Sequence, residues 1–143
     1  MNSLIKKTSL KKDEKILIEK IDNTLKMLNL YEMRYAYARE LSGGQKKLLE
    51  LGRALMKDPE ILLLDEPLAG VNPKLADNIL EIISNLHLQG INILMVEHNI
   101  NAVMKISNRV VVMAEGKIIS DGKPDFVRSD KKVIEAYLGR SDE

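Results

Sequence analysis

Apolar residues along the chain follow two patterns, a helical spacing and short uninterrupted runs. From Ile16 to Leu30 they fall on one helical stripe, and the same spacing returns over residues 48–55 and 75–86. Residues 61–64 are a continuous apolar run of strand length, and residues 91–96 are apolar except for Asn92; such runs are typical of strands buried on both faces of a sheet. Helices that alternate with such strands predict an α/β fold with a mostly parallel sheet and flanking helices.

Turn and cap residues mark where these elements begin and end. Asn72 followed by Pro73 is a favourable helix start, and Gly90 suits the end of that helix. The lysine-rich residues 1–15 lack a periodic pattern, so we expect a loose or partly ordered lead-in there. Three tyrosines within residues 31–40 can stack on nucleic acid bases or pack in a short helical connection, and the second interpretation is favoured.

The final third of the chain predicts a smaller group of elements. We expect a short helix from about Ile100 to Ser107, followed by a strand from Arg109 to Met113. The EGK tripeptide then turns the chain into a second strand, Ile118 to Ser120, in a hairpin. A last helix is expected from Lys131 to Leu138, ending at Gly139.

Composition narrows the class of protein but not its function. The 143 residues are 45% hydrophobic and 30% charged, with a formal net charge of +1, which is ordinary for a globular domain. This balance gives no reason to expect nucleic acid or an anionic membrane surface as a partner. The absence of cysteine excludes disulfides and thiolate metal sites. No apolar run approaches the roughly 18 residues of a membrane span, and the start does not predict a secretory signal.

Candidate chemistry appears where the chain reads ILLLDEP, residues 61–67. A strand that ends in Asp65 and Glu66 places two carboxylates at its carboxyl end, where open α/β sheets bind ligands. Because side chains alternate along a strand, one acid can support Mg²⁺ while the other faces an attacking water. A solvated acidic turn is the alternative, and the aliphatic run before the acids argues against it.

Two further stretches carry residues suited to phosphate. LSGGQ, residues 41–45, combines a hydroxyl, backbone amides freed by two glycines and the amino end of a helix, which together favour an anion. Its alternative is a glycine-containing turn that caps a helix. His98, just past the second apolar run, can hydrogen-bond a phosphate or a water, or simply face solvent. The sequence contains no G-x-x-x-x-G-K-[ST] loop, which would cradle phosphates.

In this order and spacing the motifs resemble the ATP-binding subunits of ABC transporters. The matching pieces are the signature LSGGQ, the Walker B segment ILLLDEP, the loop LAGVNP and the histidine in VEH. The loop AGVNP and the ending VIEAYLG are similar to the branched-chain amino-acid importer ATPases, with lipopolysaccharide-export ATPases as close relatives. Over residues 16–139 the resemblance implies a partial P-loop NTPase fold of the ABC type, lacking the Walker A half. Residues 1–40 would then be a lead-in and the end of the helical subdomain, and residues 41–143 the carboxyl-terminal part of the ATPase domain.

The resemblance also implies a role for each matching residue. Asp65 would support Mg²⁺, Glu66 would act as general base on the attacking water, and His98 would contact the γ-phosphate of ATP. Asn72 would lie at the interface of a head-to-tail dimer, where many family members have Asp, or simply serve as an N-cap. The nucleotide held by the opposite subunit would be contacted by the signature residues Ser42, Gly43, Gly44 and Gln45.

The implied function is ATP hydrolysis that energises an importer, by resemblance one for branched-chain amino acids. The implied partners are a second ATPase subunit and membrane permeases, reached through the helical subdomain at the cytoplasmic face of the membrane, without nucleic acid. Lacking a Walker A loop, the isolated chain is expected to be inactive, as a truncated subunit or one piece of a split one. The alternatives are a non-catalytic module that presents LSGGQ to a complete partner ATPase, and a soluble ATPase of the same superfamily outside transport.

Overall fold

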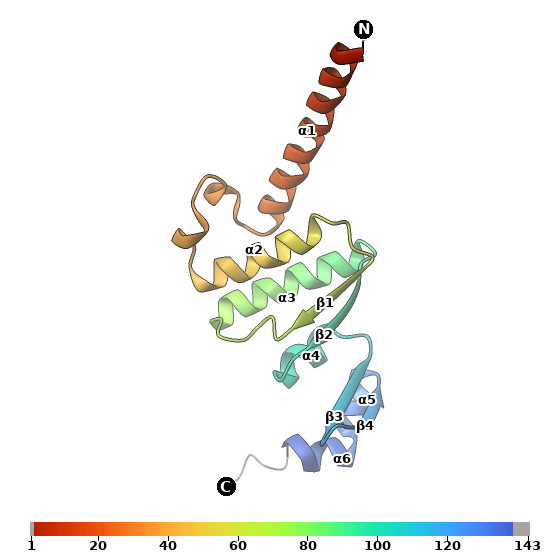
Figure 1. The fold of residues 1–143 in the computed structure, drawn as a ribbon. Coiled ribbons are helices and arrows are strands. Elements are labelled where there is room, and N and C mark those ends of the chain that lie inside the picture. The colour runs from red at the N-terminus through yellow and green to blue at the C-terminus, as the bar shows by residue number, and fades with distance from the viewer. Residues whose placement is uncertain (1, 139–143) are drawn as a thin grey trace. The chain divides into compact units, whose positions relative to one another are not determined.

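The computed structural model describes the backbone of residues 2–138 and the side chains of residues 13–137. The chain divides into two compact units, Met1–Val96 and Glu97–Glu143. Each unit contains a two-stranded sheet with helices, as Figure 1 shows. The α/β class predicted from the sequence is therefore confirmed.

The first unit is built around a parallel pair of strands. Its helices and strands are α1 (Asn2–Met27), α2 (Gly43–Leu55), β1 (Ile61–Asp65), α3 (Pro73–Leu88) and β2 (Asn92–Val96). β1 and β2 pair in parallel, with Leu63 beside Leu94. Figure 1 shows α2 and α3 side by side along this strand pair. Helix α3 begins with Asn72 and Pro73 in the cap and first positions, as the sequence predicted.

Helix α1 is longer than the apolar pattern predicted. The expected loose or partly ordered lead-in over residues 1–15 is wrong for the described part of that range, because one helix of 26 residues runs from Asn2 to Met27. This stretch contains no Gly or Pro and is rich in Lys and Leu, which both have good helix propensity. A periodic apolar stripe indicates that a helix packs against a core, so the lack of a stripe before Ile16 did not exclude a helix there.

Apolar side chains from α2, β1 and α3 form the core of the first unit. The buried members are Leu48, Leu51, Leu55, Leu62, Ile79, Leu80, Ile82, Ile83 and Leu86. On both helices they recur at spacings of three and four residues, so each helix turns one apolar face inward. This face is the stripe that the sequence pattern indicated.

The other face of the β1–β2 pair is open, so the prediction that both strands are buried on both faces is wrong. Ile61 and Leu63 are 62% and 71% exposed, and Leu94 and Val96 on β2 are 62% and 58% exposed. Leu62, which points the opposite way, is buried against the helices. The local sequence predicts a strand, but which faces are covered depends on neighbouring elements. We refer to Ile61, Leu63, Leu94 and Val96 as the open face.

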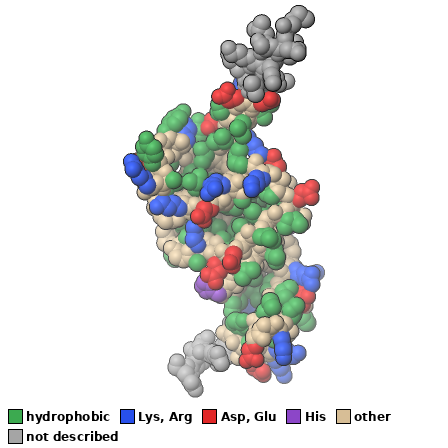
Figure 2. Space-filling model, in the orientation of Figure 1, with side chains coloured by type: hydrophobic (Ala, Val, Ile, Leu, Met, Phe, Trp, Pro, Cys, Tyr) green, Lys and Arg blue, Asp and Glu red, His purple; other side chains and the backbone are tan. Residues whose placement is uncertain are grey.

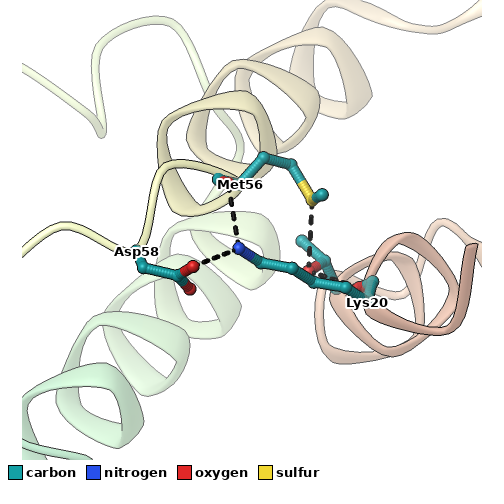
Figure 3. Close-up of polar contacts among 4 residues, drawn as sticks. Lys20, Met56 and Asp58 are labelled. Atoms are coloured by element: carbon teal, nitrogen blue, oxygen red, sulfur yellow. Dashed lines mark hydrogen bonds and ion pairs between the residues drawn. The ribbon is translucent and has the colours of Figure 1, made fainter. Parts of the chain in front are cut away.

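A lysine on α1 joins this helix to the end of α2. Lys20 Nζ donates to the Met56 carbonyl at 2.9 Å and lies 2.5 Å from Asp58 Oδ2 (Figure 3). Asp58 adopts a φ of +48°, which is uncommon for a residue other than glycine. The carbonyls in the last turn of a helix have no intrahelical partner, so the Lys20 ammonium satisfies one of them.

The segment between α1 and α2 contains two 3-10 turns, Tyr31–Met33 and Ala38–Glu40. The Arg34 guanidinium lies 4.2 Å from the ring centre of Tyr31 and 4.7 Å from that of Tyr35. Figure 2 shows hydrophobic and basic side chains together over this segment. The predicted short helical connection is confirmed, but its tyrosines stack on basic side chains at the surface instead of entering the core.

The second unit is a hairpin flanked by short helices. Its elements are α4 (Ile100–Ile106), β3 (Val110–Ala114), β4 (Lys117–Gly122), α5 (Pro124–Ser129), α6 (Lys131–Val133) and a π-helical turn (Ile134–Leu138). β3 and β4 are antiparallel, joined by Glu115 and Gly116, which both have positive φ. The hairpin and the last helical stretch were predicted, whereas α5 was missed although Pro124 suits a first helical position. The predicted end at Gly139 lies outside the described residues.

A small core holds the second unit together. Val110 on β3, Val127 on α5 and Val133 on α6 are buried against one another, with partly buried side chains from α4 and the hairpin around them. Arg109 makes two hydrogen bonds to the Asp121 carboxylate, at 2.8 and 2.6 Å, across the start of the hairpin. This bidentate pairing holds the pKa of Asp121 below its ordinary value.

Candidate active site

Two carboxylates stand at the carboxyl end of β1. Asp65 is the last residue of the strand, and Glu66 is the first residue of the turn that follows. Both are exposed, and Asp65 lies beside Val96 in the parallel register. The strand end therefore presents two acids to solvent, at the edge where open α/β sheets bind ligands.

The backbone of Glu66 is held from three directions. Its φ is +45°, a conformation that costs a non-glycine residue roughly 1–2 kcal/mol. Its N–H donates to the Val96 carbonyl at 2.9 Å, and its carbonyl accepts from the Ala69 N–H at 3.1 Å. Lys47 Nζ, from α2, lies 3.2 Å from the same carbonyl oxygen. Sequence reasoning missed Lys47, because nothing in its spacing separates it from an ordinary surface lysine.

A cavity of about 250 Å³ opens beside the acids, among α2, β1 and α3. Its lining includes the charged side chains Lys47, Glu50, Asp65 and Glu66. Apolar side chains, mainly of α2, β1 and α3, form the rest of the lining, so the cavity is partly charged and partly apolar. Its lining residues all belong to the first unit.

The LSGGQ stretch forms a capping box at the start of α2. Ser42 Oγ accepts from the Gln45 N–H at 3.2 Å, and Gln45 Oε1 accepts from the Ser42 N–H at 2.9 Å. The helix-cap interpretation is thus confirmed. The Ser42 hydroxyl acts as an acceptor in this bond, so its own O–H can still donate to an anion. Contact of Ser42, Gly43, Gly44 and Gln45 with a nucleotide stays a prediction.

Asn72 is the N-cap of α3. Its Oδ1 accepts from the Leu75 N–H at 2.9 Å, and Pro73 occupies the first helical position, where its missing N–H costs nothing. The structure therefore assigns Asn72 a helix-capping role. Its predicted place at a dimer interface stays a prediction.

His98 belongs to the second unit, shortly before α4. Its side chain is 73% exposed, and its Nδ1 lies 3.9 Å from Glu97 Oε2. Asn99 caps α4 by accepting from the Ala102 N–H at 3.1 Å. His98 is therefore available to solvent at a helix start, and its contact with a γ-phosphate stays a prediction.

The donor set at the strand end fits a magnesium–nucleotide complex. Among the described residues, no three His, Cys, Asp or Glu side chains converge to form a metal site of their own. Mg²⁺ in phosphate sites is bound by one or two carboxylates together with phosphate oxygens and water. Asp65, exposed at the end of β1, is a carboxylate of that kind.

The chain matches two family models and several characterised proteins. Residues 2–69 match the family described as ABC transporter, and residues 117–143 match the family described as branched-chain amino acid ATP-binding cassette transporter. The probable branched-chain amino acid transport ATP-binding protein LivG of Archaeoglobus fulgidus is 43% identical over 131 residues, which cover 92% of this chain and 51% of that protein. The lipopolysaccharide export system ATP-binding protein LptB of Haemophilus influenzae is 36% identical over 121 residues, covering 85% of this chain and 50% of that protein.

The fold is also shared with solved structures. An ATP-binding cassette of an ABC transporter in its ADP conformation superimposes with a TM-score of 0.77 and 41% identity, covering 87% of this chain and 50% of that chain. This chain therefore spans about half the length of the relatives that it matches. The fold, the motifs and these similarities all point to the ATP-binding domains of ABC transporters, whose family models this chain matches over residues 2–69 and 117–143.

Proposed function

We propose that this chain is part of the ATP-hydrolysing subunit of an ABC importer for branched-chain amino acids. The observation that carries the proposal is the pair Asp65 and Glu66 at the carboxyl end of a parallel strand, in a chain that matches this family. The family match over residues 117–143 and the similarity to LivG support the amino-acid class. In this proposal residues 1–40 end the helical subdomain, and residues 41–143 form the carboxyl-terminal part of the ATPase domain.

ATP with Mg²⁺ supplies the phosphoryl group and the counter-charge for its transfer. In the proposed reaction Asp65 would hold the cation, and Glu66 would accept the proton of the attacking water. His98 donates a hydrogen bond to the terminal phosphate. Ser42 and the exposed amino end of α2 bind the nucleotide of a second subunit, because free backbone amides there attract anions. Catalysis of this kind needs positioning and charge more than covalent chemistry.

The partners in this proposal are a second ATPase subunit and membrane permeases. The segment before α2 would bind the permease at the cytoplasmic face of the membrane. Among residues 2–138, none of the helices combines the length and hydrophobicity needed to cross a bilayer.

Phosphate release tests the hydrolytic role of Glu66. The sequence contains no G-x-x-x-x-G-K-[ST] loop, so the chain alone should hydrolyse no ATP. Adding the loop-bearing half of a branched-chain amino-acid relative should produce turnover. Glu66→Gln should lower that turnover by about 100-fold or more, the usual effect of removing a general base. Equal turnover in wild type and Glu66→Gln would refute the role.

Glu60→Gln is the matched control. Glu60 is an exposed carboxylate just before β1, at the opposite end of the strand from Glu66. Its replacement removes the same charge without touching the proposed site, so turnover should be unchanged.

Uptake of labelled leucine by cells that carry each variant tests the substrate class. If Glu66→Gln abolishes uptake of a different solute but leaves leucine uptake unchanged, the substrate assignment is wrong.

A non-catalytic accessory role is the second candidate. Its support is that the capping box forms within this chain and leaves Ser42 and Gly43 exposed. Mixing the chain with a complete ABC ATPase subunit should then change the hydrolysis rate of that subunit. Ser42→Arg should remove the change, and an unaltered rate on mixing would exclude this role.

A further inference from the structure

A single side chain connects the signature helix to the turn that carries Glu66. Lys47, on α2, places its Nζ 3.2 Å from the Glu66 carbonyl oxygen and 3.5 Å from the Pro67 carbonyl oxygen. An ammonium has three donors, so it can bond both carbonyls at once, the longer bond being the weaker. Lys47 is half-buried, and it lines the cavity beside Asp65 and Glu66.

The turn that Lys47 contacts is in an unfavourable backbone conformation. Glu66 has a φ of +45°, although it has a Cβ and a long side chain. Such a conformation persists only where the surroundings fix it. Here the Glu66 N–H is bonded to Val96, and its carbonyl accepts from both Ala69 and Lys47. Lys47 is the one of these three partners that comes from α2.

We propose that Lys47 is a positioning residue that couples the amino end of α2 to the carboxylate of Glu66. Lys47 lies five residues after Ser42, the N-cap of this helix, which is ~7.5 Å along the helix axis. A rigid helix transmits any shift at its amino end to the Nζ over that distance. The Nζ would then pull on the Glu66 carbonyl and so reorient its side chain.

The coupling role rests on the proposed function. In that function the amino end of α2 serves the nucleotide of a second subunit, while Glu66 serves the nucleotide next to β1. Lys47 therefore joins two nucleotide sites within one chain. Binding of nucleotide at one site would change the orientation of the general base at the other site, through the Lys47 side chain and the Glu66 carbonyl.

Amide hydrogen exchange on the full chain tests the connection without ATP. Lys47→Met keeps the length and helix propensity of the side chain but removes its charge and donors. It should speed exchange of the Ala69 amide by about fivefold or more, since the turn loses a bond of typical strength. It should also shift the carbonyl carbon resonances of Glu66 and Pro67. Lys47→Arg should restore both readouts.

Lys46→Met is the matched control. Lys46 is the exposed neighbour of Lys47, about 100° round the same helix. Its replacement should leave the Ala69 exchange rate and the two carbonyl resonances unchanged. The proposal is overturned if Lys47→Met changes neither readout, or if Lys46→Met changes them equally.

Phosphate release by the chain complemented with a loop-bearing half separates this proposal from the proposed function. Lys47→Met should lower kcat while KM for ATP stays unchanged, and Lys47→Arg should recover kcat. An unchanged kcat would overturn the coupling role. Absence of turnover in the wild-type assembly would instead count against the proposed function, and the exchange readouts would still decide whether Lys47 holds the turn.

Discussion

The two glycines of the signature stretch differ in what surrounds them. A Cβ added to Gly44 would lie 2.0 Å from Leu75 Cδ2, whereas a Cβ on Gly43 would meet no atom within 4 Å. Gly44 therefore lets α2 approach α3 closely, and Gly43 leaves the start of α2 open. The sequence motif presents the two as equivalent, but the helix packing does not.

Alanine substitutions should separate these two roles. Gly44→Ala should lower the free energy of unfolding by about 1–2 kcal/mol, because Leu75 must move to admit the methyl group. Gly43→Ala should leave stability unchanged or slightly higher, because it adds no contact and restricts the unfolded chain. Urea denaturation measures both. Equal losses in the two variants would contradict the packing role of Gly44.

A hydrogen-bonded carboxylate in the second unit links stability to acidity. Ser120 Oγ donates to Asp130 Oδ2 at 2.7 Å, and the Lys132 N–H donates to Asp130 Oδ1 at 3.0 Å. The Ser120 bond first, and the Lys132 bond second, hold the pKa of Asp130 below its ordinary value of 3.8. The folded chain therefore binds fewer protons at Asp130 than the unfolded chain. Its contribution to stability is complete above the ordinary carboxyl pKa and is lost as the pH falls through the lowered one.

Ser120→Ala should raise the pKa of Asp130 toward the ordinary carboxyl value, because the charged form loses its main donor. Titration of the carboxyl carbon resonance by NMR measures this directly. Ser129→Ala is the control, since Ser129 Oγ bonds only to backbone carbonyls in α5. An unchanged Asp130 midpoint in Ser120→Ala would show that this hydrogen bond does not form in solution.

At the scale of elements, the sequence predicted the strands and helices better than their burial. Asn72 with Pro73 marked the start of α3, because cap and φ preferences are local properties of these residues. The one-sided burial of β1 was not predictable, since it depends on which elements cover the sheet. Lys47 was missed for the same reason, because its two carbonyl partners lie about twenty residues away.

Neighbouring leucines on β1 provide a measurement of that one-sided burial. Leu62→Ala should cost about 2–4 kcal/mol of unfolding free energy, because Leu62 is buried and its loss leaves a cavity. Leu63→Ala should cost less than about 1 kcal/mol, because Leu63 is mostly solvated. Urea denaturation of the two variants gives the comparison. A comparable loss at both positions would mean that the open face is covered in solution.

At the scale of the whole molecule, the chain combines two units, each with its own two-stranded sheet. The α/β class followed from the alternation of helical and strand-like apolar patterns. The resemblance to the family followed from the order of motifs, since the signature, the acids and the histidine are each recognisable in short windows. The placement of Asp65 and Glu66 at a strand end also followed, because the apolar run and the acids are adjacent. The first half of α1, before Ile16, and the short α5 did not, because neither has the apolar period on which the prediction depended.

The open face has a consequence for the life of the chain in a cell. Chaperones and proteases act on proteins that display apolar strands and unpaired strand edges. Ile61, Leu63, Leu94 and Val96 display such a surface for as long as no other element covers it. The intracellular half-life of the chain would then depend on the fraction of molecules whose open face is covered by another element. Abundance would become a readout of assembly, independent of any nucleotide chemistry.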